Sequence, residues 1–288
     1  MIKLTFELFP RNGKIHSYKK LQGHEFRAVL MDWLAKINPE LVEKLHQANK
    51  ERPYAIKFII NKKLSKIDFI ITSFDPEINQ SILDGIVLKD EANVIIKNRS
   101  YFISTIKWEN HDLNCLIELS KPVNSFRLRF ITPVSFNTSL GNYPVRFPLP
   151  SILFGNLCNL WNSVSENFKK LERDEFIKWV NTHVYVSYYD MRTVKRNIGK
   201  PKPIVGGIGV ASYRIKNIDT HFYKNITGDI EDNETRVNFI IKDHVQKCCW
   251  IDILCKLGEF INVGTNRTAG MGVIRYKPNK FFQEIQEV

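Results

Sequence analysis

Strand and helix signals follow one another in the same order in both halves of the chain. Lys3–Phe9 alternates apolar and polar residues, which is typical of a half-buried strand. Gly23–Ile37 spaces its apolar residues three and four positions apart, which predicts an amphipathic helix. Asn38-Pro39 ends that helix and begins a shorter one, Glu40–Gln47. The remaining signals of the first half are two strands, a helix and a closing pair of strands, at Ala55–Asn61, Lys66–Ser73, Glu77–Leu88, and Asn93–Lys97 with Tyr101–Trp108. The order βαββαβ is that of the ferredoxin-like unit.

The second half repeats this element order with little residue identity to the first half. Its signals are a strand, two helices, two strands, a helix and a strand, at Ser125–Thr132, Pro148–Val164, Asp174–Val180, Val184–Thr193, Ile204–Ile215, Asp243–Ile261 and Val273–Lys277. We therefore predict an α+β chain of two tandem ferredoxin-like (βαββαβ, RRM-like) domains. The predicted domains are residues 1–121 and 122–288, with the boundary at Lys121-Pro122.

The charge of the chain restricts its partners. The formal net charge is +12 and the pI is near 9.4, which favours a polyanionic partner. Nucleic acid is the first candidate. An acidic membrane surface has only the charge in its favour, because the sequence contains no apolar run long enough to span a bilayer. The five cysteines are odd in number and lack CxxC spacing, so we expect a cytoplasmic protein without disulfides or a zinc site.

The segment GTNRTAGMGVIRY, Gly264–Tyr276, places three glycines between a predicted helix and a predicted strand. A phosphate-binding P-loop needs the opposite order and a Gly-Lys-Ser/Thr sequence, so nucleotide binding is disfavoured. Two interpretations remain. The glycines supply the positive φ angles of a plain helix-to-strand turn, or their backbone approaches an RNA phosphate while a cation supplies charge. The residues predicted to contact RNA in the second case are Gly264, Arg267, Gly270 and Gly272.

A second basic segment is the predicted loop Met191–Lys202, MRTVKRNIGKPK, which contains five cations and no acid. Such a run is commonly a solvated hairpin tip, but in a chain of this charge it favours a clamp on a phosphate backbone. Three tyrosines just before it are candidates for stacking on unpaired bases, or for packing in a core. The cations predicted to bind RNA are Arg192, Lys195, Arg196, Lys200 and Lys202.

Among seven histidines, His46 has a distinctive setting near the end of a short predicted helix, with Lys44, Lys50 and Arg52 close by in sequence. A histidine titrates near neutrality, and neighbouring cations stabilise developing negative charge. A lone histidine is more often structural, so the residues alone leave both roles open. No HExxH motif or Cys/His cluster indicates a metal.

Taken together, these segments resemble the CRISPR-associated endoribonucleases that cut precursor CRISPR RNA within each repeat. The resemblance is strongest in FITPVSFNTSLGNYPVRFPLPSILFGNLCNLW, IVGGIGVASYRI and LGEFINVGTNRTAGMGVIRY, which are Phe130–Trp161, Ile204–Ile215 and Leu257–Tyr276. In the first half it rests on element order and on the run NPELVEKLH. It implies a partner, CRISPR repeat RNA, and it leaves open a CRISPR effector complex and a homodimer.

The resemblance implies that His46 is the general acid or base, because the family places a histidine at the end of the short helix after the first long one. Lys50 or Arg52 would fill the role of the family's lysine, with Lys44 as the weaker candidate. The implied reaction is attack by the RNA 2′-hydroxyl, which gives a 2′,3′-cyclic phosphate and a 5′-hydroxyl without metal or other cofactor.

The chain departs from the family at one position. Many members use a tyrosine on the first long helix, where this chain has Met31 and Trp33. The role is either unfilled or taken by Tyr18 or Tyr54. Because some members only bind RNA, the main alternative is a catalytically inactive RNA-binding subunit of a CRISPR ribonucleoprotein complex. A general RNA-recognition domain comes third, because the stacking aromatics of that motif are missing.

Overall fold

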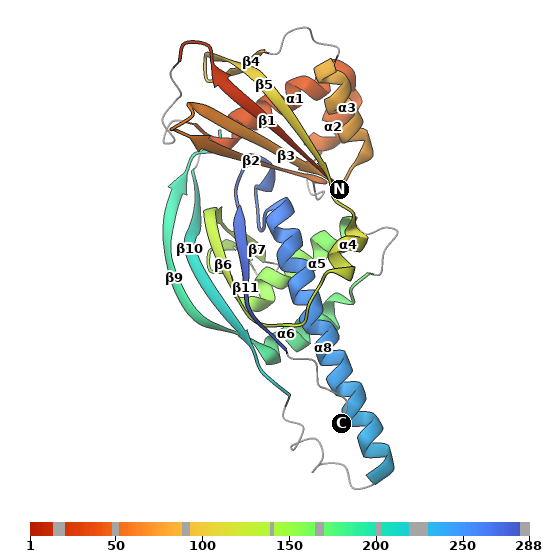
Figure 1. The fold of residues 1–288 in the computed structure, drawn as a ribbon. Helices are drawn as coiled ribbons and strands as arrows, with labels where there is room; N and C mark the ends of the chain where they lie inside the picture. Colours follow the sequence, from red (N-terminus) through yellow and green to blue (C-terminus); the bar gives the residue numbers. More distant parts are fainter. Residues whose placement is uncertain are drawn as a thin grey trace.

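A computed structural model describes residues 1–13, 21–47, 52–87, 93–138, 141–164, 170–199, 203–218 and 230–282. The chain forms two α/β units, one above the other in Figure 1. Each unit is an antiparallel sheet with helices on one face. The predicted pair of tandem ferredoxin-like domains is confirmed, and the helices and strands follow the predicted order. Among the described helices, none is long and apolar enough to cross a membrane.

The N-terminal sheet has the strand order β2-β3-β1-β5-β4. Without the added edge strand β4, this is the 4-1-3-2 order of a ferredoxin-like sheet. Its elements are β1 (Ile2–Pro10), α1 (Gly23–Ile37), α2 (Pro39–His46), β2 (Tyr54–Asn61), β3 (Lys66–Ser73), α3 (Pro76–Val87), β4 (Asn93–Ile96) and β5 (Arg99–Asn110). Aromatic side chains fill the core between sheet and helices; the ring centroids of Phe6 and Trp33, for example, lie 5.0 Å apart.

The short helix α2 begins as the sequence predicts. The Asn38 side chain accepts a hydrogen bond from the Leu41 N–H, and Pro39 occupies the first turn, where no N–H is needed. The helix ends at His46, so this histidine is fixed at a helix terminus.

The C-terminal sheet has the strand order β11-β6-β10-β9, which is again 4-1-3-2. The elements from the end of β5 onward are α4 (Leu113–Glu118), β6 (Val123–Val134), β7 (Phe136–Thr138), β8 (Gly141–Val145), α5 (Pro150–Val164), α6 (Arg173–His183), β9 (Val184–Arg196), β10 (Ile204–Ile215), α8 (Ile230–Ile261), the 3₁₀ turn η1 (Arg267–Ala269) and β11 (Ile274–Phe281). The domain boundary at Lys121-Pro122 stays a prediction; it falls just before β6.

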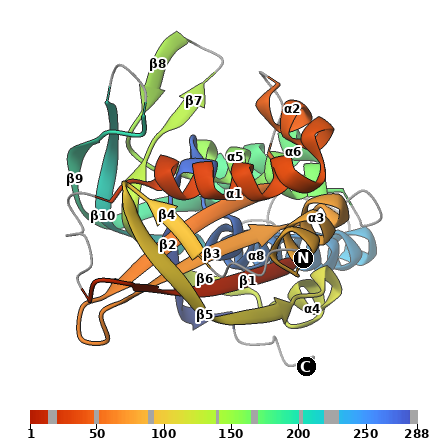
Figure 2. The ribbon, with the colours of Figure 1, turned by 90° about the horizontal axis from the view of Figure 1, so that it is seen from above.

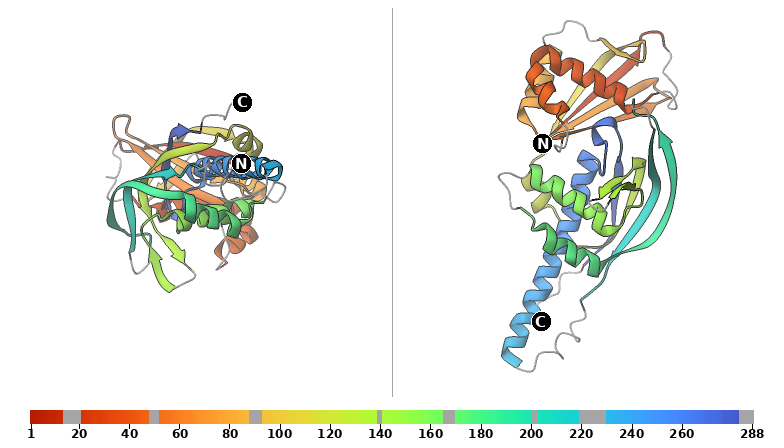
Figure 3. Two further views of the ribbon diagram at one scale, coloured as in Figure 1. Left: turned by 90° about the horizontal axis from the view of Figure 1, so that it is seen from below. Right: turned by 180° about the vertical axis from the view of Figure 1, so that it is seen from behind.

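Four segments differ from the sequence-based expectation. The short helix α4 and the short hairpin β7–β8 were not predicted. Helix α8 begins at Ile230 rather than at Asp243, and its first turns extend beyond the body of the domain (Figure 3). The basic segment after Met191 is not a loop as far as Arg196, because β9 pairs with β10 along its whole length and ends in the pair Arg196↔Ile204.

The glycine-rich segment joins the two domains. It follows α8, and η1 packs against α1 and β2 of the N-terminal domain. The Asn262 side chain donates to the Ile56 carbonyl at 3.0 Å, and the Lys57 ammonium donates to the Glu259 carbonyl. A Cβ placed on Gly23 at the start of α1 would lie 1.8 Å from the Ala269 carbonyl oxygen. The two domains therefore meet backbone to backbone.

Candidate functional site

A cleft of about 1190 Å³ lies between the two domains. One wall carries Arg27 of α1 and Arg52, which precedes β2; the other carries Arg146, Arg173 and Arg267 of the C-terminal domain. No aspartate or glutamate is among its described lining residues. In Figure 2 the hairpin β7–β8 and helix α2 stand on opposite sides of this end of the molecule. A cleft lined by charge of one sign concentrates ligands of the opposite sign, so the site fits a polyanion.

The arginines of the cleft differ in how firmly they are held. The Arg52 guanidinium donates to the Gln47 carbonyl at 2.5 Å, which ties the cleft wall to the residue that follows α2. Arg173 pairs with Asp174 at 3.1 Å on the exposed side. The Nε of Arg27 is buried and has no hydrogen-bond partner among the described residues, and the guanidinium lies close enough to Tyr54 to act on the pKa of its phenol.

His46 lies at the exposed end of α2 and is not among the lining residues of the cleft. Its Nδ1 lies 2.7 Å from the Val42 carbonyl oxygen. Because a carbonyl only accepts, this contact places the proton on Nδ1 and leaves Nε2 as the basic nitrogen. Arg52 connects this end of α2 to the cleft. Of the other predicted catalytic residues, Lys50 lies outside the described residues, and the weaker candidate Lys44 is exposed, 3.9 Å from Glu77.

Tyr54, a candidate for the family's tyrosine, is fully buried beneath the cleft wall. Burial raises the pKa of its phenol, although Arg27 and Arg52 beside it act in the opposite direction. The hydroxyl therefore stays protonated and is not exposed to the cleft. Tyr18, the other candidate, lies outside the described residues.

The glycine-rich segment is buried rather than presented to solvent. Gly264 and Arg267 belong to the lining of the cleft, whereas Gly270 and Gly272 do not. Arg267 is only 5% exposed, and its guanidinium donates to the Ile261 carbonyl at 3.2 Å and to the Arg52 carbonyl at 3.1 Å. Its charge is thus directed at protein backbone across the domain contact. The RNA contacts expected of these four residues stay predictions.

The glycines of this segment have the conformation that a helix-to-strand turn requires. Gly264 and Gly272 have φ angles of +75° and +68°, and a Cβ on Gly272 would lie 1.7 Å from the Val263 carbonyl oxygen. The local geometry of this segment is therefore that of a helix-to-strand turn, the first of its two interpretations.

The basic segment lies on strand β9. Arg192 and Lys195 are exposed and Arg196 is half-buried, while Lys200 and Lys202 lie outside the described residues. Lys195 pairs with Val205 and Arg196 with Ile204, and both partners on β10 line the cleft. The cations of β9 therefore adjoin the cleft. The three tyrosines before them are also exposed, at 49% for Tyr185, 55% for Tyr188 and 61% for Tyr189.

Sequence reasoning missed Arg27, Arg146 and Arg173 of the cleft. Arg146 stands within the segment YPVRFPLP, whose residues indicate the family resemblance rather than a phosphate contact. Arg27 was available as the one arginine of the predicted amphipathic helix Gly23–Ile37. The arginines come from α1, the β8–α5 connection and α6, so only the tertiary fold brings them together.

The comparison with solved structures shows the class of fold. Cas6 (TTHB231) of Thermus thermophilus, in a product complex, superposes with a TM-score of 0.74 at 18% identity, over 96% of this chain and 98% of that one. A second Cas6 (TTHA0078) product complex gives 0.68 at 13% identity, over 96% and 100%. A Cas6-related protein of Pyrococcus furiosus gives 0.52 at 13%, over 97% and 99%. These likenesses establish the fold of tandem ferredoxin-like domains.

The sequence itself gives the family. The model of the CRISPR-associated endoribonuclease Cas6 matches residues 128–274, just over half of the 288-residue chain. The chain therefore belongs to the Cas6 family of CRISPR-associated endoribonucleases. A search of curated proteins finds no match to this sequence.

Proposed function

We propose that this Cas6-family protein binds CRISPR repeat RNA in the arginine-lined cleft and cuts it without a metal ion. The observation that carries the proposal is the set of arginines on both walls of one interdomain cleft, four of them besides the buried Arg267, with no acid among the described lining residues. Arginine binds phosphate through a planar fork of donors and stays charged at any physiological pH. Two of the similar structures are described as product complexes and another as a RAMP protein binding different RNA substrates, which agrees with an RNA ligand.

The proposed chemistry uses the nucleophile that RNA carries. His46 Nε2 removes the proton of a 2′-hydroxyl, or His46 in its protonated form delivers a proton to the leaving 5′-oxygen. The 2′-oxygen forms a bond to phosphorus while the bond to the 5′-oxygen breaks, which leaves a 2′,3′-cyclic phosphate and a 5′-hydroxyl. Arg52, and Lys50 two residues before it in sequence, offset the negative charge that grows on the phosphate. A histidine-to-alanine variant is among the similar Cas6 structures, which is in keeping with a histidine of interest in that protein.

The test compares two RNAs. The protein is incubated in EDTA with its repeat RNA and with the same RNA carrying a single 2′-deoxy nucleotide at the cut site. The proposal predicts EDTA-resistant cleavage of the first RNA to a cyclic phosphate, and no cleavage of the second. Cleavage that requires added Mg²⁺, or that continues on the deoxy RNA, would contradict it.

One observation favours the binding-only alternative: the His46 side chain is exposed and does not line the cleft. An inactive RNA-binding subunit predicts tight binding of both RNAs and cleavage of neither. The same experiment therefore separates the two functions. Membership of an effector complex and homodimer formation both stay predictions.

A further inference from the structure

The outer face of the C-terminal sheet, opposite its helices, carries like charges directly across from one another. Arg275 of β11 pairs with Arg129 of β6, and the next pair on the same face is Lys277 with Arg127. All four side chains are exposed. Like charges placed directly opposite on neighbouring strands are destabilising. Two such pairs side by side lower the stability of the free protein by electrostatic repulsion, and a bound polyanion would offset that repulsion.

A hollow of about 540 Å³ opens beside these pairs. Its lining includes three arginines, Arg129, Arg192 and Arg275, and two aliphatic side chains, Ile131 and Ile208. None of the three guanidinium groups forms an ion pair within the described part of the chain. Beside the hollow, β6 and β10 shift register between Gly207 and Gly209. Among the described residues, cations without an ion-pair partner and the carboxylate of Asp190 surround apolar surface here, and the cations with the apolar surface suit phosphates and bases together.

The same strand connects this hollow to the cleft. Ile204 and Val205 at the start of β10 line the cleft, and Ile208 and Gly209 farther along line the hollow. On the neighbouring strand β9, Arg196 and Lys195 lie beside the cleft, and Arg192 reaches the hollow. Side chains two residues apart on one face of a strand are about 6.8 Å apart. Arg192 and Arg196 lie on one face of β9, four residues apart with Val194 between them, so they can contact separate phosphates of an extended nucleic-acid strand.

We propose that this outer sheet face is a second RNA-binding site, which holds single-stranded RNA that continues out of the cleft. The proposal rests on the proposed function only in taking the cleft as the place where the RNA begins. The occupant is a single strand rather than a duplex, because the hollow offers Ile131 and the nearby exposed Tyr188 to unstacked bases. Asp190 in the hollow accepts hydrogen bonds only, which suits the 2′-hydroxyl of RNA.

The decisive variant is Arg129→Gln with Arg275→Gln. A labelled oligouridylate is titrated with the intact protein at several salt concentrations. Loss of two phosphate contacts should weaken binding and lower the slope of log K against log salt by about 1.4, which is about 0.7 for each phosphate on a single strand. The matched control is Lys178→Gln with Lys242→Gln, two exposed cations on α6 and α8 that remove the same charge elsewhere. The control should retain the wild-type slope.

Two further measurements complete the test. The melting temperature of the double variant should be equal to or above that of the wild type, because a repulsive pair has been removed. For Asp190→Ala, the ratio of the affinity for oligouridylate to the affinity for the corresponding oligodeoxynucleotide should fall. An unchanged slope in the double variant, an equal loss in the control, or an equal loss of affinity for a blunt RNA duplex would overturn the proposal.

Failure of this proposal is distinguishable from failure of the proposed function. If the protein binds oligouridylate through Arg129 and Arg275 but never cleaves repeat RNA, the second site stands and the enzyme does not. If it cleaves repeat RNA and the double variant binds like the wild type, the second site is rejected and the enzyme stands.

Discussion

Arg267 shows how the environment of one residue changes its expected role. The sequence presents it as a cation in a glycine-rich loop, and the natural prediction is an exposed phosphate contact. In the structure it is buried and bonds two carbonyls, one of them Arg52 of the other domain. Residue type and neighbours in sequence indicate charge, whereas exposure depends on which distant segment packs over the loop.

Arg267→Ala should therefore act mainly on stability. One buried and one partly buried carbonyl group lose their donors, and each unsatisfied buried group costs about 1–3 kcal/mol. We expect the free energy of unfolding to fall by about 2–4 kcal/mol in urea titrations. The comparison is Arg146→Ala, an exposed cleft arginine, which should change stability by less than about 0.5 kcal/mol and weaken RNA binding instead. The opposite pattern would return Arg267 to the role of an exposed phosphate ligand.

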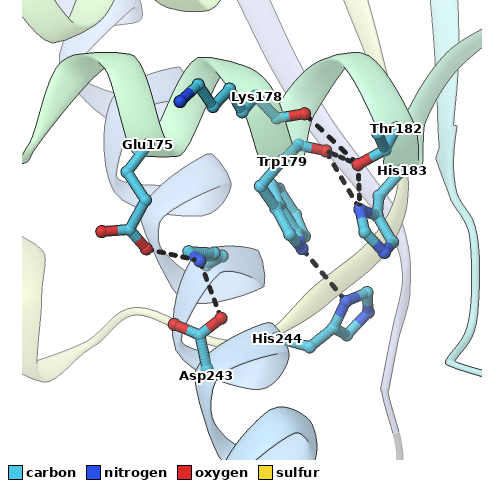
Figure 4. Close-up of polar contacts among 8 residues, drawn as sticks. Glu175, Lys178, Trp179, Thr182, His183, Asp243 and His244 are labelled. Carbon is cyan, nitrogen blue, oxygen red and sulfur yellow. Dashed lines mark hydrogen bonds and ion pairs between the residues drawn. The ribbon is translucent and has the colours of Figure 1, made fainter. Parts of the chain in front are cut away.

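His244 predicts how stability depends on pH. Its Nδ1 accepts from the Trp179 indole N–H at 3.2 Å, and its ring centroid lies 5.2 Å from that of His183 (Figure 4). Burial, reinforced by His183, lowers the pKa of His244 from 6.5 to about 4. A lowered pKa means that the unfolded chain takes up the proton first, so stability is full above pH 6.5 and falls as pH drops toward 4.

The size of the effect follows from the shift. At 1.36 kcal/mol for each pKa unit, unfolding free energy should drop by about 2 kcal/mol between pH 7 and pH 5. His244→Gln keeps an acceptor for the indole N–H but has no group to titrate, so its unfolding curves should move less over this range. Equal pH dependence in wild type and variant would show that other groups are responsible.

The elements could be predicted from the sequence to a large extent. Alternation in β1, the three- and four-residue spacing in α1 and the Asn38-Pro39 cap of α2 all depend on local patterns, and all are present. The missed features depend on tertiary partners. Strand β9 continues to Arg196 because β10 supplies hydrogen bonds along its length, which outweighs the low strand preference of a basic run.

We predict that the stability of the fold depends on the close contact between α1 and the glycine-rich segment. Gly23→Ala places a Cβ against the Ala269 carbonyl, where only a shift of backbone relieves the overlap. We expect a loss of about 2–3 kcal/mol in unfolding free energy.

The matched substitution is Gly155→Ala inside α5. Its Cβ would meet the flexible end of Arg173 at 3.3 Å and Ile177 Cδ1 at 3.9 Å, which is ordinary van der Waals contact. Because alanine is the better helix former by about 1 kcal/mol, this variant should be as stable as the wild type or more so. Similar losses in both variants would mean that the close contact at Gly23 is not the cause.

At the scale of the whole molecule, the candidate site is a product of domain arrangement. The predicted cations of β9 and Arg52 come close to a cleft whose other arginines lie on α1, on α6 and just before α5. No local pattern relates these segments, so the sequence could indicate a basic RNA-binding protein but not the cleft. The family signature indicated the reaction class, and the fold supplies the place where the substrate fits.

The central claim is that RNA held by this cleft is cut by His46 chemistry. Its most direct test is the single-turnover cleavage rate of repeat RNA by His46→Ala, with Gln47→Ala as the neighbouring control. Loss of a general acid or base should slow cleavage by about 10²–10⁴-fold while RNA affinity stays at the wild-type value, and the control should cleave normally. A His46→Ala variant that cuts at the wild-type rate would contradict the account.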